Sequence, residues 1–308
     1  MVKPGSLSKE YTYPGGHYGP TVATYNGLTV IACLKCYYRH LYPLPDHAIL
    51  TRFYADPDGF YHGSERRFKI DADHHHRGLW DSLYRWEASR LALHLGPCTR
   101  MIDLGAGTGW FVKWWSDNIG RAVGVEPAPV ARSYSPVPDR LFPTIPMAAR
   151  KFAAGNPVYL RARLVLEHLA DPVGFLREAV GIPQQVKGII IHVPNEWNPL
   201  QNRIARGGVG SWFIDKTHIN YFDRRGLECV LREAGFEPLS WYATYPLELW
   251  QLAGVRYIGD EVKGQWVHLS RLKFEKVFGN LSFKLYKLLF DRLGWGREII
   301  CIAKINDK

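Results

Sequence analysis

The spacing of apolar residues predicts alternating strands and helices from about residue 98 onward. Short apolar runs bounded by turn residues indicate buried strands, whereas apolar residues three and four positions apart indicate helices with one buried side. The predicted elements are strands at 100–104 (RMIDL), 121–126 (RAVGVE) and 187–193 (KGIIIHV), helices at 110–119 (WFVKWWSDNI) and 172–180, and the apolar segment VYLRARLVLEHL at 158–169. Repeated strand–helix alternation implies a doubly wound α/β fold, a parallel sheet with helices on both faces.

The chain before residue 98 follows a different pattern. Residues 1–62 are rich in Tyr, Pro, Gly and His, and the segment TVATYNGLTVIACLKC predicts a hairpin with Asn26 and Gly27 in its turn. A helical period follows from 64 to 95 and predicts one helix that enters the α/β domain. We therefore expect a small β-containing module at 1–62 and a larger domain at 63–308.

Two stretches of the larger domain are expected to be irregular. Residues 127–146 are rich in Pro, and residues 194–220 form a Gly-, Asn- and Trp-rich stretch that predicts a long loop. Loops of that length usually carry a function. Residues 223–243 (DRRGLECVLREAGFEPLSWYA) then predict a capped helix, a glycine stop and a strand.

Composition and charge narrow the class of protein. Hydrophobic residues make up 46% of the chain and charged residues 22%, which is typical of a globular protein. The apolar stretches are too short to span a bilayer, and the start of the chain lacks the basic-then-apolar order of a secretory signal. The five cysteines are scattered and do not indicate disulfides. We therefore expect a cytoplasmic protein without a membrane partner. The net charge of +10 is spread without an arginine-rich tract, so no nucleic-acid partner is expected.

The segment MIDLGAGTGWF at 101–111 carries the strongest chemical signal. A strand, a glycine turn and a helix cradle nucleotide-like cofactors, and nicotinamide, flavin and S-adenosylmethionine enzymes share this outline. The dinucleotide fingerprint G-x-G-x-x-G places its third glycine where this chain has Trp110. Asp103, two residues before Gly105, is also absent from the dinucleotide pattern. A dinucleotide is therefore less favoured than S-adenosylmethionine.

The segment resembles the first motif of class I S-adenosylmethionine-dependent methyltransferases, D-x-G-x-G-x-G. Glu126 in VGVEP matches the family's ribose-binding carboxylate, a group that can accept hydrogen bonds from both ribose hydroxyls. The resemblance places Asp103 near the amino-acid portion of the cofactor, where the glycine backbone can approach it closely. The implied cofactor-binding residues are Asp103, Gly105, Ala106, Gly107, Gly109, Glu126, Pro127 and Glu167.

Further segments resemble the branch of this family that contains ubiquinone-pathway O-methyltransferases and many natural-product enzymes. They are LVLEHLADPVGFLREA, HVPNEWNPLQ, THINYFDRRGLECVLREAGFEPL and GREIICIAKI, and together they cover about residues 98–308. The resemblance implies a Rossmann-like, mostly parallel seven-stranded sheet. The chain departs from the family at Pro157-Val158, where members often have Phe-Asp, and no adenine-binding carboxylate or amide is evident in 142–156.

Candidate catalytic residues follow the fourth and fifth strands, because reacting groups gather at the carboxyl ends of strands in this architecture. The candidates for catalysis are His168, Glu196, Asp215 and His218, and those for substrate contact are Asn195, Trp197, Trp212 and His76. His168 could act as a base or simply pack, and Glu196 could bind a substrate hydroxyl or ammonium or be a solvated charge. Asp215 and His218 could form a carboxylate–imidazole pair. The polar run at 73–76 could cover the substrate or be an exposed cluster.

The loop aromatics favour a polyhydroxylated substrate. Trp197 and Trp212 lie beside acids and amides, a combination that suits stacking on sugar faces with hydrogen bonds at the rim. The chain as a whole resembles enzymes of actinomycete antibiotic clusters, among them the gentamicin-type aminoglycoside N-methyltransferases. We therefore expect methylation of an amine of a small-molecule amino-sugar or other glycosylated substrate. Two alternatives stay open: an O-methyltransferase of a sugar or phenolic hydroxyl, metal-assisted through Glu167 and His168, and a cofactor-binding protein without catalysis.

The N-terminal pair Cys33 and Cys36, in CLKC, resembles part of the zinc module that precedes the catalytic domain of sugar C-methyltransferases. Those modules use two such pairs, and the first pair is absent here. His17 and His40 could complete a tetrahedral site. The favoured interpretation is a degenerate module without metal that covers the active site or docks a pathway enzyme.

Overall fold

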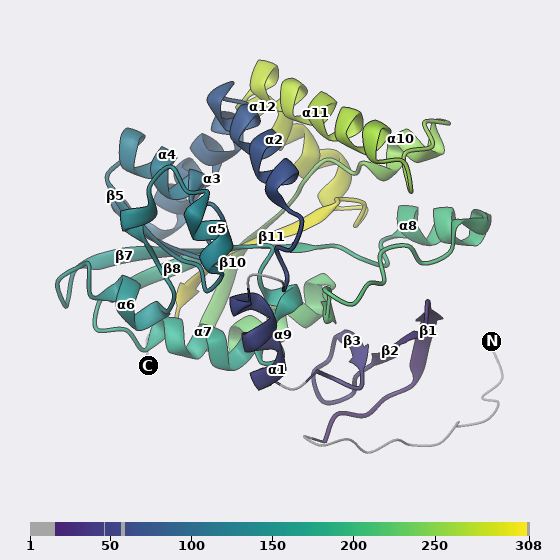
Figure 1. The fold of residues 1–308 in the computed structure, drawn as a ribbon, viewed down its shortest axis with the longest axis horizontal. Coiled ribbons are helices and arrows are strands. Elements are labelled where there is room, and N and C mark those ends of the chain that lie inside the picture. The colour runs from purple at the N-terminus through teal and green to yellow at the C-terminus, as the bar shows by residue number, and fades with distance from the viewer. Residues whose placement is uncertain (1–15, 46, 57–58, 307–308) are drawn as a thin grey trace.

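The computed structural model describes residues 16–45, 47–56 and 59–306, and a seven-stranded sheet between two layers of helices is its largest unit (Figure 1). The strand order is β10-β11-β8-β7-β4-β5-β6. The strands are β4 (Arg100–Leu104), β5 (Arg121–Val125), β6 (Leu141–Phe142), β7 (Pro157–Arg163), β8 (Gln185–Pro194), β10 (Phe236–Ala243) and β11 (Glu298–Ile305). β11 pairs antiparallel with both neighbours, and the other pairs are parallel. The expected Rossmann-like, mostly parallel sheet is confirmed.

Alternate side chains of the strands face two separate cores. In β4, Met101 and Ile102 are both fully buried but belong to different apolar clusters, because successive side chains point to opposite faces. One face packs against α6 (Ile145–Ala149), α7 (Pro172–Val180) and α9 (Arg224–Glu233), and the other against α3 (Asp81–Leu95), α4 (Trp110–Asn118), α11 (Glu261–Phe278) and α12 (Asn280–Tyr286). Helices therefore cover both faces, as the sequence pattern predicts.

The single helix expected at 64–95 is two helices. α2 (Glu65–His76) ends before Gly78, whose φ of 61° is incompatible with a continuous helix, and α3 starts at Asp81. Glycine reaches this conformation without the steric cost that other residues carry. The break allows the chain to change direction between α2 and α3. The sequence pattern did not predict it because the helical spacing of apolar residues continues across Gly78.

The two stretches expected to be irregular contain short elements. The Pro-rich span 127–146 holds α5 (Pro129–Ser133), β6 and the start of α6, and the long loop 194–220 holds α8 (Pro199–Ile204), a π-helical turn (Ala205–Val209) and the first residue of β9 (Asn220–Tyr221). Asn198 caps α8, since its side-chain oxygen accepts hydrogen bonds from the backbone of Leu200 and Gln201. An Asn-Pro pair is a helix-start signal that the surrounding loop composition concealed.

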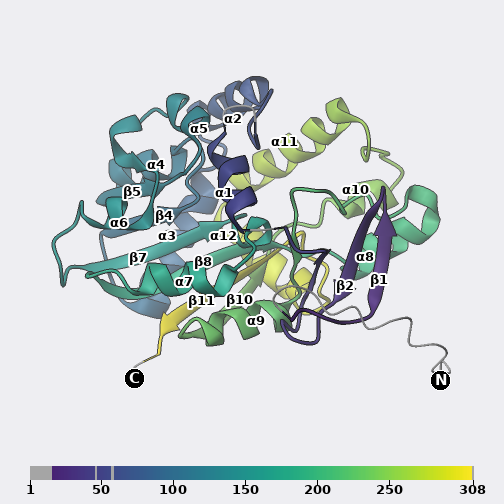
Figure 2. The ribbon, with the colours of Figure 1, turned by 60° about the horizontal axis from the view of Figure 1, so that its bottom comes forward.

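The N-terminal module forms a second sheet with a strand from the larger domain. β1 (Thr21–Tyr25), β2 (Leu28–Ala32) and β3 (Arg39–Tyr42) are antiparallel, and β9 pairs with β3 as the fourth strand. The hairpin turn is where the sequence predicts it, with positive φ at Asn26 (49°) and Gly27 (78°). Figure 2 shows this sheet at the side of the molecule, next to the segment that carries α8. The module therefore shares its sheet with the larger domain.

Two further α-helices are α1 (His47–Ala55), which follows β3, and α10 (Glu248–Leu252), which follows β10. Short helical turns lie at Pro138–Arg140, Leu166–His168 and Lys287–Asp291. Among the described residues, no helix combines the length and apolar character needed to cross a membrane.

Candidate active site at the carboxyl ends of the strands

The glycine turn after β4 has a backbone that side chains would disrupt. Gly105, Gly107 and Gly109 have φ values of 70°, 55° and 80°, a region that favours glycine. A Cβ on Gly105 would lie 2.3 Å from a methyl carbon of Val165. Among the described residues, a Cβ on Gly107 would have only the Tyr61 hydroxyl nearby, at 3.9 Å, so this part of the backbone is open to a ligand.

Glu126 ties this turn to the end of β5. One carboxylate oxygen accepts a hydrogen bond from the backbone of Gly107 at 2.9 Å and the other from Ala128 at 2.9 Å. Burial raises the pKa of Glu126 to about 7, although both backbone donors oppose this shift. A carboxylate oxygen can accept a second hydrogen bond, so Glu126 keeps acceptor capacity for the two ribose hydroxyls assigned to it from the sequence.

Asp103 lies beneath the turn in a buried ionic network. Its Oδ1 accepts a hydrogen bond from Arg161 at 3.0 Å, and Arg161 also donates to Glu87 at 2.7 Å. Burial raises the pKa of Asp103, and Arg161 opposes this shift. Asp103 Oδ2 is buried and has no hydrogen-bond partner within the described part of the chain. An orphaned carboxylate oxygen beside a glycine turn fits a ligand that carries an ammonium group.

The sequence reasoning missed this network, which continues across the sheet. His192 of β8 contacts Glu87 at 3.1 Å and Glu298 at 3.2 Å, and Glu298 accepts a hydrogen bond from Arg163 at 3.1 Å. The sequence feature that could have predicted this network is a pair of arginines, Arg161 and Arg163, at alternate positions of an otherwise apolar strand. Buried charges need partners, so two such arginines imply buried carboxylates.

The second half of the site is a cluster of two histidines and two glutamates. His218 Nδ1 lies 2.7 Å from Glu196 Oε1, and the His168 and His218 rings are 5.1 Å apart. His168 Nδ1 donates to the backbone carbonyl of Thr217 at 2.7 Å, which leaves Nε2 as the acceptor. That Nε2 lies 3.9 Å from Glu167 Oε1. The structure thus brings His168, Glu196 and His218 together, and Glu167 joins this cluster.

Burial sets opposite charge states on the two histidines. Burial lowers the pKa of His168 to about 4, with the charge of His218 acting in the same direction. Burial also acts on His218, but the hydrogen bond to Glu196 and nearby carboxylates outweigh it and raise its pKa to about 9. Burial raises the pKa of Glu167 to about 8. Near pH 7, His168 is neutral and His218 is a cation paired with Glu196.

The segment that follows β3 covers this cluster. The rings of Tyr54, in α1, and Phe60 lie 6.0 and 5.2 Å from the His168 ring. Tyr61 contacts Phe60 edge-to-face, with ring centres 4.8 Å apart, and reaches the glycine turn with its hydroxyl. The pKa of Tyr54 is raised by burial and by the charges of both Glu167 and Glu126. One covering segment therefore spans the glycine turn and the histidine cluster, and no sequence motif marked its residues.

The structure corrects the expected pairing of Asp215 with His218. The imidazole of His218 pairs with Glu196, whereas Asp215 Oδ1 accepts hydrogen bonds from the Thr217 backbone and hydroxyl and from the His218 backbone. Asp215 is exposed and holds the loop backbone in a turn. Adjacency in sequence favoured Asp215, but the turn directs the imidazole toward the end of β8.

The candidate substrate contacts also lie differently from expectation. Trp197 and Trp212 are half-buried and both contact Phe213 edge-on, with ring centres 4.7 and 5.3 Å apart, in the apolar cluster beneath the N-terminal sheet. The Asn195 amide donates to the carbonyls of Gly294 and Gly296 and is engaged in holding that loop. Each of these three residues therefore has a contact within the protein, and a role of the half-buried tryptophans in substrate binding stays a prediction.

The histidine run at 74–76 is not one exposed polar cluster. His74 is buried, and the His75 ring stacks on Trp110 at 5.0 Å with nearly parallel planes. Only His76 is exposed, with its ring edge against Trp110 at 4.9 Å. The run fastens α2 to the first residue of α4, directly after the glycine turn.

Comparisons with solved structures report fold likeness at low identity. A SAM dependent methyltransferase from Archaeoglobus fulgidus is 17% identical, with a TM-score of 0.45 over 72% of this chain and 94% of that chain. Geranyl diphosphate C-methyltransferase from Streptomyces coelicolor A3(2), in complex with Mg²⁺, geranyl diphosphate and S-adenosyl-L-homocysteine, is 14% identical, with a TM-score of 0.44 over 82% and 89%. The cyclopropane synthase MmaA2 from Mycobacterium tuberculosis is 14% identical, with a TM-score of 0.42 over 70% and 83%.

Among curated proteins, none matches this chain. The family comparison is decisive instead, because residues 73–240, more than half of the 308 residues, match a family described as a methyltransferase domain. This range contains the glycine turn, Glu126 and the whole histidine cluster. The chain therefore belongs to the methyltransferase domain family.

Proposed function

We propose that the protein transfers a methyl group from S-adenosylmethionine to an amine of an amino sugar, such as an aminoglycoside intermediate of antibiotic biosynthesis. The observation that carries the proposal is the neutral His168 beside the charged His218–Glu196 pair, under the segment that also covers the glycine turn. An acceptor amine and a cofactor methyl group would meet between these two halves.

The residues of the glycine turn fit S-adenosylmethionine. Asp103 Oδ2 is an orphaned buried acceptor for the cofactor's ammonium group, and Glu126 has acceptor capacity for the ribose. The open backbone at Gly107 allows close approach between them. When bound, the cofactor supplies a methyl group on a positively charged sulfur, which makes that carbon electrophilic.

The histidine cluster suits an amine acceptor. An amine attacks only after it loses its proton, and His168 Nε2 is an unprotonated acceptor near pH 7 because its pKa is lowered to about 4. Both oxygens of Glu167 and Oε2 of Glu196 are buried without partners among the described residues. Glu196 Oε2 is an acceptor, and Glu167, mostly protonated near pH 7 because its pKa is raised to about 8, offers one donor and one acceptor to the amine and hydroxyl groups of an amino sugar. The adjacent charge of His218 disfavours the protonated amine.

A second candidate function rests on a specific arrangement. One ligand atom each from Glu167, His168 and His218 lies within 4.8 Å of the others, so the three could hold a metal ion. A divalent ion would lower the pKa of a bound hydroxyl and support O-methylation of a sugar or phenol. In that case His218 would lose its Nε2 proton to bind the metal, while Nδ1–H keeps its hydrogen bond to Glu196.

The test is a panel of aminoglycosides, their N-acetylated forms and plain polyols, incubated with S-adenosylmethionine and analysed by mass spectrometry. N-methylation predicts a methyl gain on the free amines and none on the acetylated forms, with activity unchanged by chelator. Methyl gain on polyols that a chelator abolishes would establish the second function instead. Cofactor binding by calorimetry without any transfer would contradict both and indicate a binding protein.

A further inference from the structure

The turn between β2 and β3 brings two cysteine sulfurs to one side. Cys33 and Cys36 flank a tight loop in which the Cys36 backbone N–H donates to Cys33 Sγ at 3.4 Å and the Tyr37 backbone donates to the Cys33 carbonyl at 3.1 Å. Tyr37 has a φ of 62°, which closes the turn before β3 begins. Both cysteines are free thiols. A backbone N–H directed at a cysteine sulfur stabilises a thiolate.

The segment before β1 carries His17 to these sulfurs. The backbones of Ala32 and Leu34 donate to the carbonyls of Pro20 and Tyr18, each at 2.9 Å, so this segment is bound alongside the turn. The approach is close, since a Cβ on Gly19 would lie 1.9 Å from the Ala32 carbonyl oxygen. As a result, His17 Nδ1 lies 3.1 Å from Cys36 Sγ and 3.7 Å from Cys33 Sγ.

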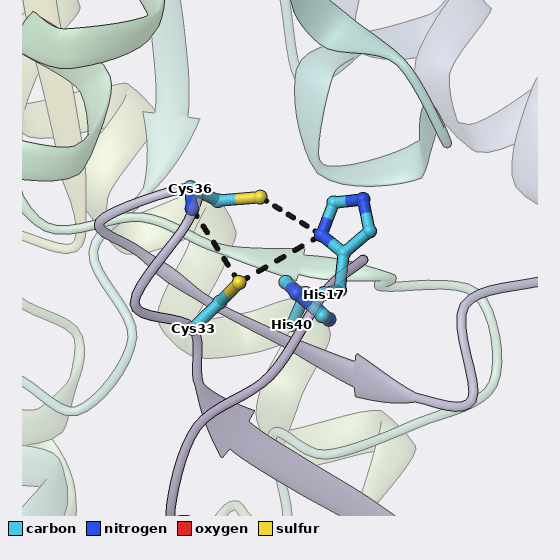
Figure 3. Close-up of side chains that lie close together, drawn as sticks. All are labelled: His17, Cys33, Cys36 and His40. Carbon is cyan, nitrogen blue, oxygen red and sulfur yellow. Dashed lines mark hydrogen bonds between the residues drawn. The ribbon is translucent and has the colours of Figure 1, made fainter. Parts of the chain in front are cut away.

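His40 completes the group from β3 and has one nitrogen left without a partner. Its side chain is 1% exposed, and its Nδ1 donates to the Leu41 carbonyl at 2.8 Å, which leaves Nε2 with a lone pair. That Nε2 is buried and unpartnered among the residues the structure describes. The rings of His17 and His40 are 5.1 Å apart and nearly perpendicular. Figure 3 shows the four side chains gathered at this point.

We propose that Cys33, Cys36, His17 and His40 bind a structural zinc ion. The four ligand atoms all lie within 4.8 Å of one another. A tetrahedral zinc site, with Zn–S about 2.3 Å and Zn–N about 2.0 Å, separates its ligand atoms by about 3.3 to 3.8 Å, so small side-chain movements suffice to close the site. The Leu41 carbonyl fixes the tautomer of His40, which is the usual role of a carbonyl behind a ligating histidine.

The site is closed and structural. Four protein ligands fill a tetrahedral zinc, so no position remains for water or substrate. The sequence did not favour a metal because only one C-x-x-C pair is present; here the two histidines replace the second pair. They come from positions 17 and 40, on either side of the cysteines, so the expected spacing of paired motifs does not apply.

The zinc would also hold one wall of the active site. His40 pairs with Asn220 of β9, and the Asn220 amide donates to the Leu166 carbonyl at 2.9 Å. The neighbouring Ile219 backbone donates to the Glu167 carbonyl at 2.7 Å. A continuous path of strand pairing and hydrogen bonds, one of them from the Asn220 side chain, thus joins the metal ligands to the residues next to His168 and His218.

Metal analysis of the full chain, purified without an affinity tag that binds metal, tests the proposal. We expect about one zinc per wild-type chain and about 0.1 or less in Cys36→Ser and His40→Ala. The matched controls are Cys229→Ser, a half-buried cysteine in α9, and His168→Ala, and both should retain about one zinc. Cobalt substitution should give the visible absorption bands of a tetrahedral site with thiolate ligands.

A second measurement does not depend on the folding of variants. Titration of the folded wild type with a mercurial thiol reagent, in the presence of a zinc-sensitive dye, should release zinc as the thiols react. A wild-type chain without zinc, or with Cys33 and Cys36 joined as a disulfide, would overturn the proposal. So would zinc that remains in both ligand variants and disappears in His168→Ala, because the metal would then lie at the active-site cluster. None of these results depends on methyl transfer.

Discussion

The two halves of the candidate active site, the glycine turn with Glu126 and the histidine cluster that we propose holds the acceptor, are built in different ways. The cofactor half lies within residues 103–128, where a glycine turn and Glu126 are joined by hydrogen bonds to the backbone. The acceptor half draws its side chains from distant segments, since Tyr54 lies in α1 whereas His168, Glu196 and His218 follow β7, β8 and α8. Backbone geometry therefore defines the cofactor half, and buried charged and ionisable side chains define the acceptor half. Substitutions should separate cofactor binding from turnover.

The largest effect on turnover is expected from His168→Ala. Removal of the neutral acceptor at Nε2 should lower kcat by about 10³-fold, within the range observed for loss of a general base. Cofactor affinity measured by calorimetry should change little, because His168 belongs to the acceptor half. His94→Ala is the matched control, since His94 is also a histidine with a pKa lowered by burial but contacts Tyr242 instead. Wild-type kcat in His168→Ala would mean that another group removes the proton.

In the cofactor half, Gly105→Ala should weaken S-adenosylmethionine binding by about 100-fold, equivalent to about 2.7 kcal/mol. The left-handed backbone costs a non-glycine residue about 1 to 2 kcal/mol, and the new methyl group would displace Val165. Gly155→Ala is the control, because Gly155 has a φ of 75° but no atom of residues 16–45, 47–56 or 59–306 within 4 Å of its Cβ position. Equal losses in both variants would show that backbone strain alone is responsible and that the contact with Val165 is irrelevant.

The same contrast explains what the sequence could predict. The glycine turn, its flanking strands and Glu126 are encoded by nearby residues, so their spacing along the chain was sufficient to predict them. Apolar periodicity predicted the main alternation of strands and helices, but not the break between α2 and α3 or the short elements in 127–146 and 194–220. The His218–Glu196 pair and the cover by Tyr54 and Phe60 depend on tertiary contacts that have no local pattern. Because proximity in the sequence does not show these contacts, Asp215 was wrongly favoured over Glu196 as the partner of the His218 imidazole.

A pH dependence of stability should report the His218–Glu196 pair. The pKa of His218 is raised to about 9 in the folded protein, so its stabilising contribution is complete below its ordinary value of 6.5 and is lost as the pH rises through about 9. Glu196→Gln removes the carboxylate that raises this pKa. The variant should therefore have a melting temperature about 2 to 4 °C lower than wild type at pH 6.5, with the difference shrinking toward pH 10.

Thermal unfolding at pH 6.5 and pH 10 measures this difference. Glu237→Gln serves as the control, since Glu237 forms an exposed pair with Lys304 at 3.1 Å and such pairs contribute little. A difference between wild type and Glu196→Gln that stays constant with pH would mean that His218 is not charged in the folded protein. The acceptor half would then lack the electrostatic character that distinguishes it from the cofactor half.

The smallest effect is expected from Asp215→Asn. The amide keeps the oxygen that accepts hydrogen bonds from Thr217 and His218, so the turn should persist, and only a nearby negative charge is lost. That charge helps to raise the pKa of His218 but ranks after Glu196 and Glu167. We expect kcat within about threefold of wild type, because an exposed charge contributes about 1 kcal/mol or less. A loss comparable with that of His168→Ala would show that Asp215 acts on the substrate directly, and the acceptor half would then extend onto the exposed loop.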